Sequence, residues 1–171
     1  MKAAERRQLI LERLDQTQKP LSASYLAKEL GVSRQAIVGD VALLRANHHG
    51  ILSTHRGYLL EKNLSSQAQY IGKIACQHGA DAVEKELALV IELGGKVMTV
   101  EVDHPIYGTL SAPLQIGTQD DVQHFMTSLE SYEDALLSSL TQGIHVHTIA
   151  CETKDQFDNI RTALEEANIA L

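Results

Sequence analysis

The chain of 171 residues is 44% hydrophobic and 22% charged, and its formal net charge is −7. This length suits one ordinary domain or two small ones, and the composition excludes wholesale disorder. No apolar run approaches the roughly 20 residues that cross a bilayer, and charges interrupt the first residues, unlike a secretory signal. We therefore expect a cytoplasmic protein with no membrane partner. Its two cysteines, Cys76 and Cys151, are too few for a disulfide framework and are expected to be small buried hydrophobic residues.

The charge is distributed unevenly along the chain. Residues 1–63 hold ten Lys or Arg and six Asp or Glu, which gives a formal charge of +4. Residues 64–171 hold five Lys or Arg and sixteen Asp or Glu, which gives a formal charge of −11. A basic front joined to an acidic back indicates two modules with different partners. The basic module is suited to a polyanion, which would repel the acidic one.

Three helices are predicted in the basic module. The first covers residues 4–15. Ser22 is a good N-cap for the next helix, Gly31 suits the left-handed position that ends it, and Ser33 caps the third helix. The expected apolar positions are Tyr25, Leu26 and Leu30 on the second helix and Ile37, Val38, Val41 and Leu44 on the third. Two short helices joined by a tight turn form the helix-turn-helix pattern, although a helical pair that simply packs gives a similar pattern.

DNA binding follows from what the third helix exposes. Its first residues, Ser33, Arg34 and Gln35, would meet base edges and phosphates in the major groove. Short strands over 51–53 and 58–60 predict a two-stranded wing, with Arg56 at its tip as a further contact. Asp40 and Arg45 are expected to lie on a solvated face or to contact phosphates, and not to read bases.

The acidic module, after a linker over 64–69, alternates between strands and helices. Strands are predicted over 70–77, 96–102, 109–116 and 144–150, and helices over 81–93, 120–129 and 155–167, with a further helical piece over 132–141. The order is βαββαβ plus a terminal helix. The fold class is therefore α+β: a winged helix-turn-helix over 1–63, and over 64–171 a ferredoxin-like antiparallel sheet with helices on one face.

Three histidines of the acidic module are candidates for a metal site. His145 and His147 are two residues apart in a predicted strand, so they point to the same face. His78 ends the first strand of the same sheet, and a glutamate of the following helix, Glu84 or Glu86, could add a carboxylate. Imidazole suits zinc, nickel, copper and iron, but a hydrogen-bonded pair of buried histidines without metal would show the same spacing.

The motifs HPIYG, residues 104–108, and LTQGIHVHTI, residues 140–149, follow a winged helix-turn-helix in this chain. With these motifs the sequence resembles the 3H-domain transcriptional regulators, and in particular the niacin-responsive repressors of that architecture. The resemblance covers about residues 5–60 and 70–170. It implies one divalent transition metal per chain (nickel or zinc, with iron possible) held by His78, Glu86, His145 and His147.

The resemblance also implies a function. A homodimer would bind operator DNA and repress genes for NAD biosynthesis or niacin uptake, with nicotinic acid or a similar small acid as co-repressor. His104 and Tyr107 are the candidate effector-binding residues. The competing interpretation of His104, which precedes Pro105, is a turn residue at the end of a strand. Two alternatives use the same residues: a regulator that responds to the metal itself, and a metal-dependent enzyme with an appended DNA-binding domain. No general base or nucleophile stands beside the histidines in the sequence, so we expect no enzyme.

Overall fold

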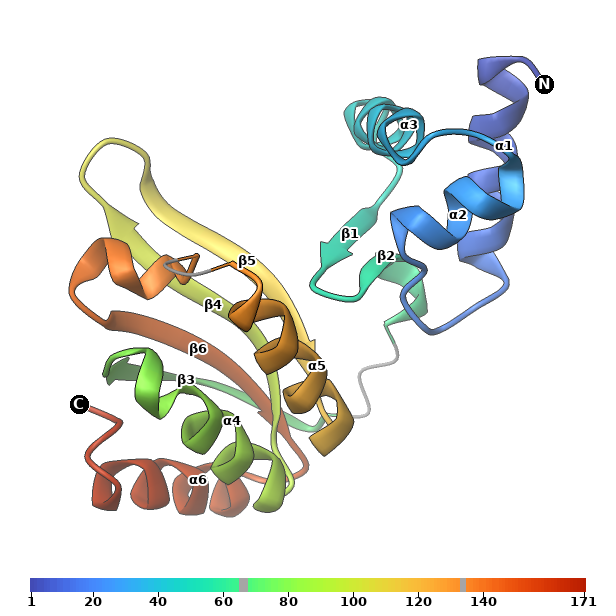
Figure 1. Ribbon diagram of the computed structural model, residues 1–171. Coiled ribbons are helices and arrows are strands. Elements are labelled where there is room, and N and C mark those ends of the chain that lie inside the picture. Colours follow the sequence, from blue (N-terminus) through green and yellow to red (C-terminus); the bar gives the residue numbers. More distant parts are fainter. Residues whose placement is uncertain (65–67, 133–134) are drawn as a thin grey trace. The chain divides into compact units, whose positions relative to one another are not determined.

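The computed structural model describes residues 1–64, 68–132 and 135–171 (Figure 1). Contacts between residues divide the chain into two compact units, Met1–Ser65 and Ser66–Leu171. The predicted linker over 64–69 and the predicted helical piece over 132–141 each include residues outside the described ranges. Within the described residues, no helix is long and apolar enough to cross a membrane.

The N-terminal unit contains three helices followed by a two-stranded antiparallel sheet. Its elements are α1 (Ala3–Asp15), α2 (Ala23–Leu30), α3 (Arg34–Ala46), β1 (Ile51–Thr54), β2 (Gly57–Leu60) and the short 3-10 helix η1 (Glu61–Asn63). One apolar core joins them; its fully buried side chains include Ile10, Leu14, Leu26 and Ile37. The predicted helix-turn-helix and wing are therefore confirmed, with bounds within one or two residues of those expected.

Local contacts explain why the chain turns between α2 and α3. The Ser22 and Ser33 hydroxyls accept hydrogen bonds from the backbone N–H groups of Tyr25 and Ala36, at 3.0 and 3.1 Å. Gly31 ends α2 at φ +66°, a left-handed conformation that glycine adopts without steric cost. These residues fix both ends of α2 and the start of α3, as the sequence predicted.

Two predicted positions in this unit were wrong. Tyr25 is 53% exposed and does not contribute to the inner face of α2, which is formed by smaller residues and by Leu26 and Leu30. Asp40 does not lie on a solvated face but is 4% exposed, where it pairs with Arg6 and Arg7 of α1. A buried carboxylate requires such partners, and none could be assigned from the spacing within α3 alone.

The C-terminal unit is a two-layer α+β domain. Its strands are β3 (Tyr70–Gln77), β4 (Lys96–His104), β5 (Gly108–Ile116) and β6 (Ile144–Cys151), and its helices are α4 (Val83–Glu92), α5 (Gln119–Glu130) and α6 (Lys154–Glu166). Short 3-10 helices precede α4 (η2, Ala80–Ala82) and β6 (η3, Leu137–Thr141). The α+β class and the βαββαβ order are confirmed.

The order of strands in this sheet is β3-β6-β4-β5, and every pair is antiparallel. A ferredoxin-like sheet has its first strand in the centre and its last strand at an edge, whereas here β3 is the edge strand and β6 lies between β3 and β4. The expected strand arrangement was thus wrong in this detail. Strand β6 carries no Lys, Arg, Asp or Glu, which suits a central position, whereas β3 carries the exposed Lys73, which an edge strand tolerates.

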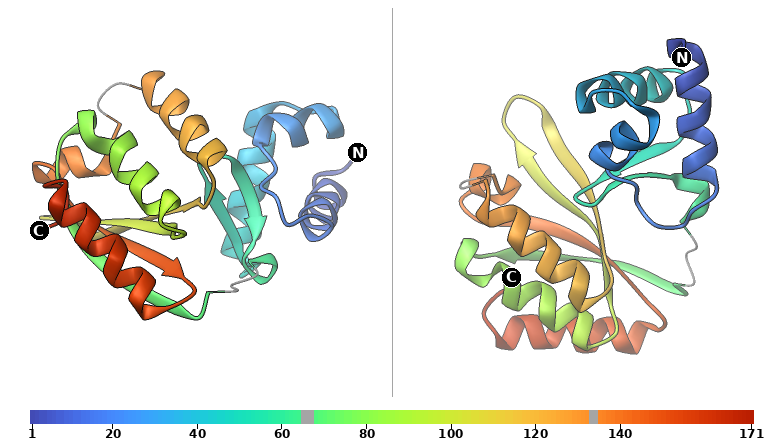
Figure 2. Two further views of the ribbon diagram at one scale, coloured as in Figure 1. Left: turned by 90° about the horizontal axis from the view of Figure 1, so that it is seen from below. Right: turned by 45° about the vertical axis from the view of Figure 1, so that its right-hand side comes forward.

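Helices α4, α5 and α6 cover one face of the sheet (Figures 1 and 2). Their buried residues and the inward side chains of the strands form one apolar core, with Leu87, Ile149, Phe157 and Ile160 almost fully buried. The end of the chain pairs with the outer edge of β3, where the Leu171 N–H donates to the Ala75 carbonyl at 2.9 Å. This pairing satisfies backbone groups that an edge strand would otherwise expose.

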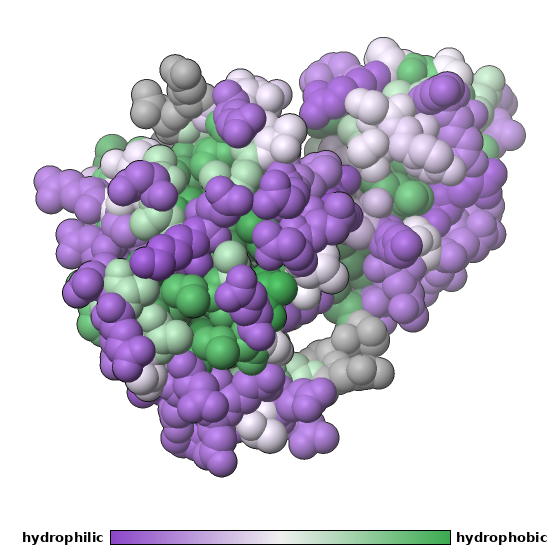
Figure 3. Space-filling model, turned by 60° about the horizontal axis from the view of Figure 1, so that its bottom comes forward, coloured by the Kyte–Doolittle hydropathy of each residue, from purple (hydrophilic) through white to green (hydrophobic). Residues whose placement is uncertain are grey.

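On the face of the molecule shown in Figure 3, apolar side chains appear as patches between hydrophilic ones. Isolated apolar patches are normal on a water-exposed protein.

Candidate metal centre and DNA-contacting helix

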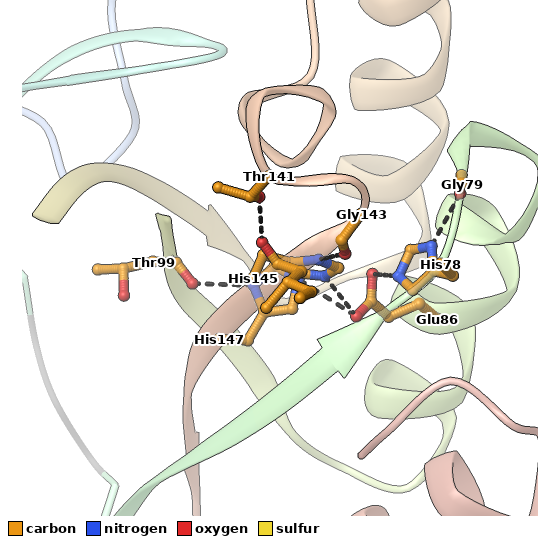
Figure 4. A network of polar contacts seen from close by, with 9 residues as sticks. His78, Gly79, Glu86, Thr99, Thr141, Gly143, His145 and His147 are labelled. Atoms are coloured by element: carbon orange, nitrogen blue, oxygen red, sulfur yellow. Dashed lines mark hydrogen bonds and ion pairs between the residues drawn. The ribbon is translucent and has the colours of Figure 1, made fainter. Parts of the chain in front are cut away.

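The four residues implied as metal ligands are brought together by the pairing of β3 with β6. Cys76 of β3 is opposite His145 of β6, so His78, which follows β3, lies beside the start of β6. His145 and His147 point to the helix-covered face, where Glu86 projects from the first turn of α4 (Figure 4). Residues 59 positions apart thus meet at one end of the domain core.

The carboxylate of Glu86 lies at the centre of the cluster (Figure 4). Its Oε2 is 2.8 Å from His78 Nε2, and its Oε1 is 3.0 Å from His145 Nε2 and 3.4 Å from His147 Nε2. All four side chains are nearly inaccessible, with exposed fractions between 2% and 6%. Every Nε2 atom of the three histidines therefore faces one buried carboxylate.

The other ring nitrogens fix how the histidines are protonated. Each Nδ1 contacts a backbone carbonyl: His78 that of Gly79 at 2.8 Å, His145 that of Gly143 at 2.8 Å, and His147 that of Thr99 at 2.9 Å. A carbonyl oxygen only accepts, so each Nδ1 carries the hydrogen and a neutral ring presents a lone pair at Nε2.

A lone pair and a carboxylate oxygen repel each other, so the cluster needs positive charge between them. A metal ion or a proton on Nε2 can supply it. Burial raises the pKa of Glu86, but hydrogen bonds from His145, His147 and His78 outweigh burial, and the pKa lies well below its usual range. The hydrogen bond to Glu86 raises the pKa of His78, with burial opposing it. The cluster is therefore built to hold positive charge.

These residues fit a divalent transition metal. Three imidazoles oriented through Nδ1 by backbone carbonyls, together with one carboxylate, are a common donor set for such ions, and hydrogen bonding of the second ring nitrogen is the usual support of a metal-binding histidine. The ambiguity between Glu84 and Glu86 is resolved by the helix: Glu86 is buried in the cluster, whereas Glu84 is exposed and accepts a hydrogen bond from Gln123.

Gly143 is required where β6 begins. Its φ is +88°, and a Cβ at this position would lie 2.5 Å from the carbonyl oxygen of His78. The Gly143 carbonyl accepts from the backbone N–H of His78 at 3.3 Å and from His145 Nδ1. One residue without a side chain thus orients two members of the cluster.

Cys76 is a neighbour of the cluster that the sequence reasoning missed. It is fully buried, as expected for a small hydrophobic residue, but its sulfur and the ligand atoms of Glu86 and His145 all lie within 4.8 Å of one another. The signal was present in the sequence, because Cys76 and His78 are two residues apart at the end of one strand. The second cysteine, Cys151, is also buried and free, as expected.

A cavity of about 520 Å³ lies beside His78. Its lining includes the apolar or aromatic side chains of Met126, Leu129, Tyr132 and Leu136. It also includes the polar residues Ser138, Ser139 and Gln142 and the acidic residue Glu130. The described residues that line it do not include the effector candidates His104 and Tyr107. His104 instead caps the β4–β5 turn, where its Nδ1 accepts the N–H groups of Ile106 and Tyr107 at 3.2 and 3.3 Å.

The predicted DNA contacts lie on α3 and the wing. Ser33, Arg34 and Gln35 are exposed at the start of α3, and Arg45 is exposed in its last turn. Arg56 is half-buried in the turn between β1 and β2. The Ser33 oxygen caps the helix by accepting the Ala36 N–H, which leaves its own O–H able to donate to a phosphate. This arrangement is that of a recognition helix with an adjacent wing.

Comparison with known proteins identifies both units. Residues 6–59 match the HTH domain and residues 71–171 match the 3H domain. The chain is 40% identical over 169 residues to the transcription repressor NadR of Bacillus subtilis, covering 98% of this chain and 94% of that protein. It is 32% identical over 162 residues to the probable transcription repressor NiaR of Thermotoga maritima, covering 95% and 91%. It is thus a regulator rather than an enzyme, and the chain belongs to the 3H-domain family of DNA-binding transcription repressors.

Proposed function

We propose that this repressor is controlled by a small aromatic acid, nicotinic acid or a close analogue, that binds beside a divalent metal in the 3H domain. The metal is nickel or zinc, with iron as a further possibility, and each chain holds one ion through His78, Glu86, His145 and His147. The genes under control are those for NAD biosynthesis or niacin uptake. The observation that carries the proposal is the convergence of three Nε2 atoms on one buried carboxylate.

The cavity beside His78 supports the position of the effector. Its volume of about 520 Å³ falls within the range of roughly 300–1,000 Å³ typical of small-molecule sites. A bound metal supplies positive charge and an open position for a carboxylate or a pyridine nitrogen. The apolar side chains of Met126, Leu129 and Leu136 suit an aromatic ring, and Ser138 and Gln142 offer hydrogen bonds to a carboxylate. This cavity replaces His104 and Tyr107 as the proposed effector site.

The DNA-binding unit supplies the output. We propose a homodimer in which two α3 helices enter successive major grooves, about 34 Å apart on the operator. Effector binding alters repression only if the effector binds the DNA-competent dimer with a different affinity from the other state. A repressor that binds operator DNA acts where the chromosome is, which in a bacterium is the cytoplasm.

Calorimetric titration of nicotinate into metal-loaded protein tests the proposal. We expect wild-type protein to bind nicotinate and His145→Ala to lose most of this affinity. His124→Ala, which removes an exposed histidine of α5, is the matched control and should bind as wild type does. Unchanged nicotinate affinity in His145→Ala would place the effector away from the metal.

A second candidate function is a metal sensor, in which the ion itself is the signal. The same histidine cluster favours it, because a bound ion would supply positive charge beside the buried Glu86 carboxylate at the core of the domain. Operator binding measured with and without nicotinate at saturating nickel separates the two. A response to nicotinate supports the co-repressor, whereas a response to nickel alone supports the sensor.

A further inference from the structure

The metal centre has a buried thiol beside it. Cys76 lies on the helix-covered face of β3, opposite His145, and its exposed fraction is 0%. Two residues before His78 in the same strand, it approaches Glu86 from the strand side of the cluster.

Cys76 contacts polar groups, not only apolar ones. Its sulfur lies within 4.8 Å of ligand atoms of both Glu86 and His145. Burial and the Glu86 carboxylate, which accepts the thiol hydrogen, raise the pKa of Cys76 well above that of a free thiol.

The other buried cysteine provides a contrast. Cys151 is the last residue of β6, at the opposite end of this strand from His145. Its thiol donates to the Thr153 carbonyl at 3.2 Å. No histidine is among its described contacts. A buried thiol that only fills space would resemble Cys151, whereas Cys76 adjoins an imidazole and a carboxylate that can both bind an ion.

We propose that Cys76 is a sulfur ligand of this centre, so that a thiophilic divalent ion such as cadmium binds through Cys76, Glu86 and His145. The inference rests on the proposed metal centre and extends its ligand set. Binding forms a metal–sulfur bond and breaks the S–H bond, and the proton passes to solvent. Nickel, when held by the three imidazoles and Glu86, leaves the thiol protonated. The centre thereby distinguishes ions by their affinity for sulfur.

The absorption spectrum of cobalt-loaded protein tests the metal–sulfur bond. We expect the wild-type protein to show a sulfur-to-cobalt charge-transfer band in the near ultraviolet. Cys76→Ser should abolish this band, and Cys151→Ser, the matched control, should keep it. Cobalt bound by the wild type without the band would overturn the inference while leaving the metal centre intact, whereas failure to bind cobalt, nickel or zinc would overturn the proposed function itself.

Metal affinities give an independent readout. Loss of a residue that merely supports a ligand costs about 10- to 100-fold in metal affinity, so loss of a direct ligand should weaken cadmium binding by at least about tenfold. Nickel affinity should change far less in Cys76→Ser, because the serine hydroxyl still donates to Glu86. Equal losses for cadmium and nickel would assign Cys76 to positioning Glu86 instead. Cadmium NMR of the wild-type protein, with a shift to the downfield region of sulfur ligation expected, decides the point even if the variant does not fold.

Discussion

The Nε2 atom of His145 lies 3.0 Å from Oε1 of Glu86, although the residues are 59 positions apart in the chain. The contact joins β6, one of the two central strands of the sheet, to the first turn of α4. Two further histidines face the same carboxylate, and each has its other ring nitrogen bound to a backbone carbonyl. This relationship turns three separate histidines into one candidate site.

Replacing Glu86 by Gln should weaken nickel binding at least about tenfold, because the only anionic ligand of the nickel site becomes a neutral amide. Glu84→Gln is the matched control: it makes the same change in the same helix turn, but its side chain is exposed. Competition with a metal-binding dye measures both affinities. Equal affinities in the two variants would contradict the assignment of Glu86.

Metal affinity should rise with pH across the range in which His78 loses its proton. The pKa of His78 is raised from 6.5 by its hydrogen bond to Glu86, so metal and proton compete for Nε2 up to a higher pH than for a free histidine. The free energy of unfolding of the metal-free protein should instead fall over the same pH range. Because the pKa of His78 is higher in the folded than in the unfolded protein, it stabilises the fold at every pH below the unfolded-state pKa. This stabilisation is lost as the pH rises through the folded-state pKa.

Dye competition for the metal and urea unfolding of the metal-free protein, each over a pH series, measure these two trends. A metal affinity that does not change with pH would exclude His78 as a ligand.

Gly143→Ala should destabilise the metal-free 3H domain by about 1–3 kcal/mol, because alanine would have to adopt a positive φ and its Cβ would clash with a neighbouring backbone atom. The added Cβ would lie 2.5 Å from the His78 carbonyl oxygen, and the shift should also weaken metal binding. Gly108→Ala is the control, since Gly108 has a φ of +70° but open space around it, and should cost only about 1 kcal/mol. Urea unfolding gives both values, and the idea fails if Gly143→Ala is the milder change.

Arg34→Ala should weaken operator binding by about 1–3 kcal/mol, because Arg34 is exposed at the start of α3, where side chains reach base edges. Affinity of the wild type should fall steeply with salt, as for any contact with phosphates. Arg161→Ala, on α6 of the other unit, removes an equal charge and should have little effect. Fluorescence anisotropy over a salt series checks both expectations, and an operator affinity independent of salt would argue against the role of the basic unit.

Much of the local structure could be predicted because it depends on neighbouring residues. The Ser22 and Ser33 caps, the turn at Gly31 and the strand that places His145 and His147 on one face all follow from backbone geometry over a few residues. The predicted strand over 70–77 has the same bounds as β3. Positions that depend on a distant partner were the ones missed: the buried Asp40, which pairs with α1, and the outward Tyr25.

By itself, the sequence determined the α+β class, the helix-turn-helix and the pair of histidines, because helix and strand periods are set locally. Only the tertiary structure decided the partners of that pair. Glu84 and Glu86 are about 200° apart around a helix, so only the packing of α4 on the sheet selects which carboxylate is buried. Likewise, the pairing of Cys76 with His145 is a register between strands far apart in the chain. Such a register is fixed by burial of one sheet face, which involves the whole domain and no single segment.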